Sequence, residues 1–187
     1  MAIRDILIWP NPRLMKISAP VELVDGKVPD EIKTLVRDMF LTMYDADGIG
    51  LAAPQVGALV RVVVVDIRAY EREQADGKVE IPSGETAIAL INPVFSEKSG
   101  KLEWEEGCLS VPGETGMVTR SAKCRVDYVD VDGQPHHIQA EGLKAIALQH
   151  ECDHLDGKLF VDYLSPLKRG VIKRKMLRLI EREEAAE

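Results

Sequence analysis

Three parts of the chain carry apolar residues at the spacing of an amphipathic helix. The first is predicted to begin near Asp30, which can cap it, and to end within 45–48. Its apolar face is made by Ile32, Leu35, Val36, Met39, Phe40 and Met43. A second helix is predicted after Gly142, and a third over about 166–184. One face of the second helix leads up to a histidine through Leu143, Ile146, Ala147 and His150. Packing in the core is the expected role of these apolar faces.

Runs of β-branched residues predict strands between the first two helices. The run 61–67 is dominated by valine, so we expect a strand buried on both faces. Segment 69–86 is charged and contains Gly and Pro, which predicts a surface loop with an insertion. A further strand is predicted over 87–95. Asn92 and Pro93 interrupt it, which indicates an edge strand or a bulge.

A hairpin is predicted before the second helix. Strands over 123–131 and 135–140 flank Asp132 and Gly133, a dipeptide favoured in tight turns. The expected fold is α+β: mixed, largely antiparallel strands around a central helix, with flanking N- and C-terminal helices. The length favours one domain over 1–187.

Composition excludes several classes of protein. The chain is 45% hydrophobic and 29% charged, which is ordinary for a globular domain. Its net charge of -7 argues against general DNA binding. Three cysteines imply no disulfide framework and favour a reducing compartment. We see no secretory or transit signal and no apolar run long enough to span a membrane, so we expect a cytoplasmic protein.

The second predicted helix carries the pattern H-E-x-x-H. His150 and His154 are four residues apart and therefore share one helix face, where both imidazoles can reach one metal ion. Glu151 is offset around the helix but stays near the open side of such an ion, as a general base would. Catalytic sites of this kind usually take a third protein ligand.

The familiar sources of that third ligand fit poorly. Phe160 stands where one class of zinc protease has its third histidine. The next glutamate after the motif is Glu181, in the charged tail, which makes it a poor ligand. His136 and His137 follow a turn and are expected to be exposed strand residues.

A cysteine is the stronger candidate. Cys152 lies two residues from each histidine, so its side chain points away from their face. Cys124 falls in a strand-like run of mixed character. Cys108 lies in 105–112, where Gly and Pro frame a backbone that can approach a site closely.

Three motifs in this order resemble those of the peptide deformylase family. They read GIGLAAPQVG at 48–57, EGCLS at 106–110 and QHECDH at 149–154. The resemblance extends from Trp9 to Leu167, nearly the whole chain. It implies hydrolysis of the formyl group from the N-terminal formyl-methionine of newly made polypeptides, which releases formate.

The resemblance also implies roles for individual residues. The metal ligands would be Cys108, His150 and His154, with Cys124 and Cys152 left as packing residues. Glu151 would move the proton, and Gln55 and the backbone N–H of Leu109 would bind the oxyanion. Without the family, 48–57 is better explained as a simple tight loop. The resemblance also implies that the metal ion is Fe²⁺ in the cell and that Ni²⁺, Co²⁺ or Zn²⁺ could occupy the same site.

The implied substrate is an N-formyl-methionyl nascent peptide that lies extended beside 48–50. The residues expected to bind it are Ile49, Gly50, Gly107, Leu143, Ile146 and Ala147. In well-known bacterial members of the family, an arginine follows the second motif and helps to hold the peptide. In this chain the first arginine there is Arg120, which leaves contacts beyond methionine open.

Charged residues near the motifs and in the last helix have plainer explanations. Glu103, Glu105 and Glu106 could form an acidic cluster, but a solvated strand face is expected for the first two. Asp153 and Asp156 are expected to form a surface or supporting pair without chemistry. The last helix carries a basic cluster that is either a solvated face or a contact with ribosomal RNA: Lys168, Arg169, Lys173, Arg174, Lys175 and Arg178.

Two other functions remain to be weighed. A zinc endopeptidase would share the H-E-x-x-H helix, but Phe160 and the cysteine motif argue against it. A non-catalytic metal-binding module for ribosome association would need neither Glu151 nor Gln55.

Overall fold

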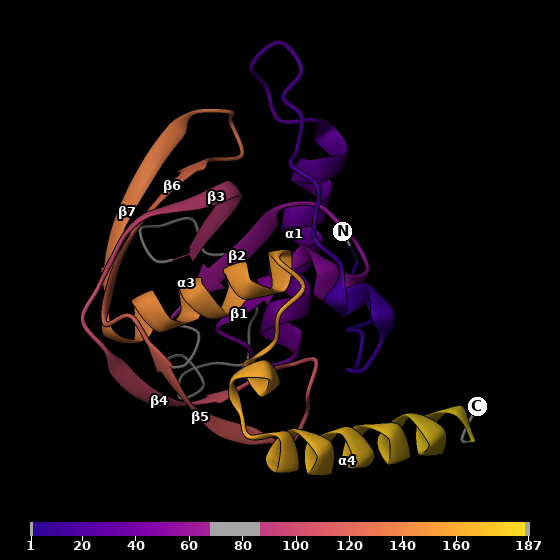
Figure 1. Cartoon of the computed structure of the whole chain (residues 1–187). Helices are drawn as coiled ribbons and strands as arrows, with labels where there is room; N and C mark the ends of the chain where they lie inside the picture. The colour runs from indigo at the N-terminus through magenta and orange to yellow at the C-terminus, as the bar shows by residue number, and fades with distance from the viewer. Residues whose placement is uncertain (1, 68–86, 186–187) are drawn as a thin grey trace, which may run out of the picture.

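The computed structural model describes residues 2–67 and 87–185. Its strands form a five-stranded sheet in the order β1-β2-β3-β6-β7 and a separate two-stranded sheet, β4-β5 (Figure 1). The larger sheet contains β1 (Gly50–Ala52), β2 (Val62–Asp66), β3 (Ala87–Ser99), β6 (Lys123–Val129) and β7 (Pro135–Glu141). The smaller one contains β4 (Leu102–Gly107) and β5 (Thr115–Arg120). All neighbouring strands pair antiparallel, which confirms the predicted α+β class.

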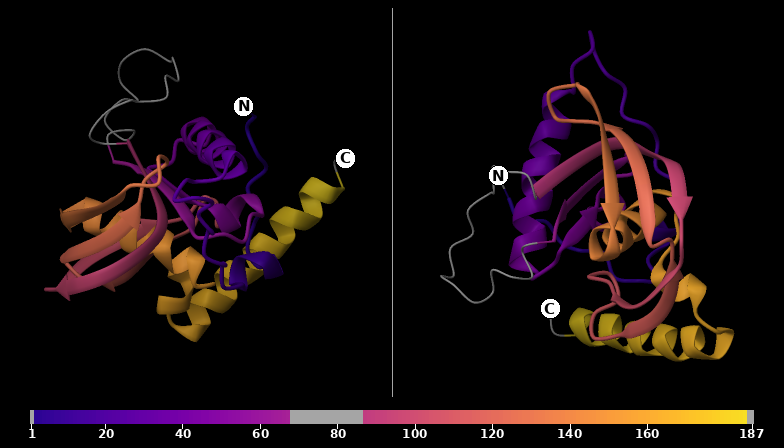
Figure 2. Two further views of the ribbon diagram at one scale, coloured as in Figure 1. Left: turned by 90° about the horizontal axis from the view of Figure 1, so that it is seen from above. Right: turned by 90° about the vertical axis from the view of Figure 1, so that its left-hand side faces the viewer.

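Helices cover both faces of the larger sheet. These are α1 (Asp30–Asp45) and α3 (Gly142–Leu155), and short 3-10 turns join other elements at η1 (Pro12–Met15), η2 (Ala53–Val56) and η3 (Phe160–Tyr163). Figure 2 shows α1 and α3 on opposite sides of the sheet. A last helix, α4 (Pro166–Glu184), runs past the smaller sheet at the bottom of Figure 1.

The valine run of β2 explains why the two helices can share one sheet. Val62 and Val64 pack in the apolar cluster that includes α1, whereas Val63 and Val65 pack in the cluster that includes α3. Side chains alternate across a strand, so a continuous apolar run serves two cores. The prediction of a strand buried on both faces is confirmed.

The strand after the loop differs in detail from the prediction. β3 continues to Ser99, beyond the predicted end, because its distal half pairs with β6. It lies between β2 and β6 and so is not an edge strand. The register shifts between Ile91 and Val94, which makes Asn92 and Pro93 a bulge. The predicted loop at 69–86 lies outside the described residues.

Helix ends show two further points. Asp30 is the first residue of α1 and not its cap; Pro29 holds the cap position without a side-chain hydrogen bond. Ser165 caps α4 by accepting from the Lys168 N–H, and α4 packs through Ile172 and Met176. In the part of the chain that the structure describes, every helix is too short or too polar to cross a membrane.

Candidate metal and catalytic centre

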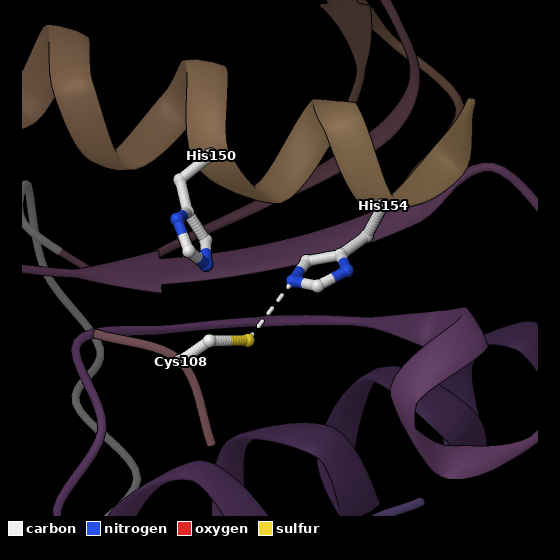
Figure 3. Close-up of side chains that lie close together, drawn as sticks. All are labelled: Cys108, His150 and His154. Atoms are coloured by element: carbon white, nitrogen blue, oxygen red, sulfur yellow. Dashed lines mark hydrogen bonds between the residues drawn. The ribbon is translucent and has the colours of Figure 1, made fainter. Parts of the chain in front are cut away.

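Two histidines of α3 and one cysteine from the end of β4 meet in the interior. His150 and His154 lie one turn apart on a buried part of α3, with ring centroids 5.1 Å apart. Cys108 follows the last residue of β4 and faces them (Figure 3). Its Sγ is 3.3 Å from His154 Nε2. One ligand atom from each of the three side chains lies within 4.8 Å of the others, so the group could hold a metal ion.

The chemistry of this donor set suits a catalytic ion. Two imidazoles and a thiolate are the softer ligands that Fe²⁺, Co²⁺, Ni²⁺ and Zn²⁺ accept, and three protein ligands leave a position open. Beside them, Glu151 Oε2 is buried and has no hydrogen-bond partner among the described residues. A buried carboxylate oxygen normally has a partner, so this atom is available to a group that the protein does not supply.

Glu151 is buried against Gly50 of β1. Burial raises the pKa of its carboxyl to about 7, with the charges of His150 and Arg120 acting in the opposite direction. A Cβ placed on Gly50 would collide with the Glu151 carboxylate. Gly50 therefore leaves the space that Glu151 occupies.

Glu106 fixes the ring of His150, and sequence reasoning did not assign it this role. Its Oε2 accepts from His150 Nδ1 at 2.8 Å, which leaves Nε2 for the centre. Arg120 of β5 donates to both carboxylate oxygens, at 2.7 and 2.9 Å. Burial disfavours the charge of Glu106, but hydrogen bonds from Arg120 and His150 prevail and lower its pKa to about 2. A signal was present: Glu106 lies on the strand face opposite to Glu105.

The two histidines have pKa values shifted in opposite directions. Burial works against the charged form of both. Hydrogen bonding to Cys108 and Glu106 nevertheless raises the pKa of His150 well above its usual value. The pKa of His154 falls well below it, because the charges of His150 and Arg120 add to the effect of burial.

Gln55 reaches the same centre from η2. Its side-chain oxygen accepts from the Ala52 N–H, which orients the amide. The Nε2 group donates to Ser110 at 3.2 Å and lies 3.5 Å from Cys108 Sγ. Leu109 packs against Gly48, where an added Cβ would approach its Cδ1 to 2.8 Å. The first and second motifs are thus joined at the edge of the centre.

The residues expected to bind substrate occupy varied positions. Ile146 and Ala147 are buried in α3, and Ile49 packs against the same apolar cluster as Ala147. Leu143 is partly buried at the start of α3, whereas Gly107 is exposed at the end of β4. The structure therefore brings the α3 face and β1 together, and Gly107 directly precedes the ligand candidate Cys108.

The remaining candidates lie apart from the centre. His136 and His137 are exposed on β7, and Cys124 and Cys152 are buried packing residues, all as expected. Burial raises the pKa of both of these thiols. Glu181 is exposed on α4. Glu103 and Glu105 are exposed, as predicted for a solvated strand face.

Asp153, in the third motif, and Asp156, just after it, do not pair with each other. Asp156 binds Arg61 at 2.8 Å, and Asp153 binds Arg120 and Tyr163. Two surface grooves, of about 400 and 540 Å³, lie elsewhere: one along β3, β6 and β7, the other between the N-terminal segment and α4. None of the three ligand candidates lines either groove.

Comparison with known proteins agrees with this geometry. The profile of the polypeptide deformylase family matches residues 3–170. A peptide deformylase of Alkalilimnicola ehrlichii is 48% identical over 96% of this chain and 92% of its own length. One from Stutzerimonas stutzeri is 48% identical over 99% of this chain and its full length. The crystal structure of a peptide deformylase from Legionella pneumophila superposes with a TM-score of 0.82 at 45% identity, covering 99% of each chain. The chain belongs to the polypeptide deformylase family, enzymes that remove the N-formyl group from nascent peptides.

Proposed function

We propose that Cys108, His150 and His154 bind one divalent metal ion and that Glu151 moves the proton in deformylation. The observation that carries this proposal is the convergence of the three donor atoms beside a buried carboxylate. The bound ion would supply Lewis acidity, which lowers the pKa of water and polarises the formyl carbonyl. Burial of Glu151, which raises its pKa to about 7, suits a group that accepts and then gives up a proton.

The protein residues divide the remaining work. Glu151 accepts a proton as water attacks the formyl carbon, and it delivers that proton to the amine nitrogen as the C–N bond breaks. Formate and a free amino terminus result. The oxyanion of the tetrahedral intermediate is bound by Gln55 Nε2 and the backbone N–H of Leu109. The position of Gln55 supports this role, because its side-chain amide is already oriented toward Cys108.

The peptide would pair with β1. This strand ends the five-stranded sheet, so one of its edges is not paired with another described strand. An extended substrate could add there through main-chain hydrogen bonds beside Ile49 and Gly50. Ile146, Ala147 and Leu143 would face the methionine side chain, and Gly107 would border it.

A chemical assay tests the reaction with its metal dependence. Formate release from formyl-Met-Ala-Ser should require metal in protein prepared without oxygen, and a chelator should abolish it. Release that survives complete removal of metal would contradict the proposal. The Cys108→Ala variant should bind less metal, whereas Cys124→Ala, a buried thiol outside the centre, should bind as the parent does.

Fe²⁺ is the ion we infer for the cell. The donor set accepts Ni²⁺, Co²⁺ and Zn²⁺ as well, so the choice of iron rests on the family. A thiolate beside Fe²⁺ is open to oxidation, which predicts that air inactivates the iron form and spares the nickel form. An iron form that keeps full activity through prolonged aeration would speak against iron.

We also propose that α4 contacts the ribosome. Its basic side chains are all exposed, and two of them are already paired: Arg169 with Asp162 and Lys175 with Glu114. Replacing Lys173 and Arg174 by Glu should weaken sedimentation with ribosomes and leave turnover of a free peptide unchanged. Unchanged sedimentation would mean a solvated helix face. The cytoplasmic location expected from the sequence stays a prediction.

The geometry does not support the alternative function of a zinc endopeptidase. Phe160, at the position of the third histidine in such proteases, is fully buried, and its ring stacks near His150 at 6.5 Å between centroids. A phenyl ring offers no ligand atom.

A further inference from the structure

A hydrogen-bonded chain runs from the surface to His150. Tyr163, in η3, donates its hydroxyl to Asp153 Oδ2 at 2.7 Å. Asp153 binds the Arg120 guanidinium, and that guanidinium also lies over the Tyr163 ring at 4.7 Å. Arg120 in turn holds Glu106, which accepts from His150. Tyr163 thus contacts Arg120 directly through its ring and indirectly through Asp153, and it lies outside all three sequence motifs.

We propose that Tyr163 is a positioning residue for His150, acting through Asp153, Arg120 and Glu106. The inference rests on the proposed function, in which His150 is a metal ligand. Partners that lie behind a metal-binding histidine set the orientation and basicity of its ring. Tyr163 is four contacts away from His150 along this path and would act by keeping the Arg120 guanidinium in one place.

The charge balance explains why a hydroxyl matters at this position. Arg120 is the cation shared by two carboxylates, Glu106 and Asp153, and its side chain is only 4% exposed. The Tyr163 hydroxyl donates a second hydrogen bond to the Asp153 carboxylate. Asp153 therefore competes less with Glu106 for the Arg120 guanidinium. Both bonds from Arg120 to Glu106 are then kept, and Glu106 stays aligned with His150.

The aromatic ring contributes separately. A guanidinium over an aromatic face is attracted by the ring and is also limited to one plane. Burial, together with the hydrogen bond to Asp153, raises the pKa of Tyr163 to about 12, so its hydroxyl remains a donor. The side chain is nevertheless 47% exposed, and apolar burial therefore explains little of its placement.

The alternative is a structural role alone, in which Tyr163 closes η3 against its neighbours. The two roles differ in what they do to the metal. A structural role would change the stability of the apo and zinc-loaded proteins alike. A positioning role changes how fast metal leaves a protein that remains folded.

The test compares Tyr163→Phe with Tyr44→Phe. Tyr44 is a matched control, since its hydroxyl also donates to a carboxylate, Asp66, at 2.9 Å, but on α1. Each protein is loaded with Zn²⁺, and transfer of zinc to a chromogenic chelator is timed. We expect Tyr163→Phe to lose zinc about 10-fold faster, the low end of the effect of such partners, and Tyr44→Phe to match the parent. Tyr163→Leu, which also removes the ring, should lose it faster still.

Two further measurements distinguish failure of the Tyr163 inference from failure of the proposed metal site. Tyr163→Phe should shift the visible spectrum of the Co²⁺ form, because the His150 ring is less fixed, while its apo form melts like the parent. Parental zinc release in Tyr163→Phe, with or without a lower melting temperature, would overturn the positioning role. If Cys108→Ala also kept zinc like the parent, the proposed metal site would fail, and this inference with it. Zinc loss in Cys108→Ala alone would leave the site standing and remove only Tyr163.

Discussion

The helix α3 and the hairpin β4-β5 contribute to the proposed centre in different ways. The helix carries two ligands and the general base within little more than one turn, so local geometry alone places them. The hairpin brings Cys108 from 46 positions before His154, and with it Glu106. These two hairpin residues are two apart, which puts both on the face that meets the helix. The helix supplies most of the reacting groups, whereas the hairpin completes and fixes them.

The attachment of the hairpin to the helix is electrostatic. Arg120 of β5 lies between Glu106 on its own hairpin and Asp153 on α3. Glu106 and Arg120 are buried and Asp153 is partly buried, so the loss of one partner leaves an uncompensated charge. The hairpin should therefore be the more fragile half of the centre, and a change in either half should produce a different kind of failure.

The largest expected effect is the loss of turnover when the general base on α3 is replaced. Replacing Glu151 by Gln removes the proton acceptor but keeps the shape and burial of the side chain. Turnover of formyl-Met-Ala-Ser should fall by about 10²- to 10⁴-fold, while bound metal stays at one ion per chain. Steady-state kinetics and metal analysis of the same preparation measure both. A fully active Glu151→Gln protein would exclude Glu151 as the base.

A hairpin change should affect the metal first. Glu106→Gln removes the charge that holds both His150 and Arg120, so affinity for Zn²⁺ should fall by about 10- to 100-fold. Competition with a chelator measures it. Glu103→Gln is the matched control, because Glu103 is exposed on the same strand and should leave affinity unchanged. Equal affinities in the two variants would mean that the hairpin does not support the ligand.

A smaller effect is expected where the helix meets β1. In Gly50→Ala, the new methyl group would displace the Glu151 carboxylate, because the three atoms nearest to it all belong to Glu151. Turnover should fall by about 10- to 100-fold, as for a catalytic group moved by a fraction of an ångström or more, and zinc affinity should hold. Gly170→Ala on α4, where the added Cβ has room, serves as the control. Loss of metal in Gly50→Ala would place the damage in the ligands and contradict this account.

The difference between the helix, which depends on local sequence, and the hairpin, which depends on distant partners, also decides what the sequence could predict. Periodicity predicts α1, α3, α4 and the β6-β7 hairpin, because each depends on neighbours a few residues away. The three ligand candidates were found because two share a helix turn and the family motifs supplied the third. The strand β5 was not predicted: Thr115–Arg120 alternates exposed and buried residues but is short and begins beside a glycine.

The sequence did not reveal the partners of residues that act through distant contacts. Strand alternation could separate Glu106 from Glu105, but its partner Arg120 follows only from the pairing of β4 with β5, which sets Glu106 opposite Gly116. Arg120 stood out only as the first arginine after the second motif, and nothing in the sequence singled out Tyr163. Their roles arise from folding the hairpin onto α3, which a single sequence does not encode locally.

The smallest effect concerns a similar ion pair with no ligand behind it. Asp38 of α1 accepts from the Ala2 N–H at 2.9 Å and from Arg4 at 2.9 and 3.0 Å. Burial opposes its charge, but the hydrogen bonds from Ala2 and Arg4 prevail and lower the pKa of Asp38. A lowered pKa stabilises the fold above the unfolded value of about 3.9, and the benefit is lost as pH falls through the folded value.

Asp38→Asn should therefore reduce the free energy of unfolding at pH 7, and its difference from the parent should shrink as the pH approaches 3. Urea unfolding of apo proteins across this range measures that difference, with exposed Asp5→Asn as the control. The loss at pH 7 should leave zinc release unchanged, because this pair joins α1 to the N-terminal segment and touches no ligand. If Asp38→Asn released zinc as fast as Glu106→Gln, general loss of stability would explain both, and the hairpin would have no special part in holding His150.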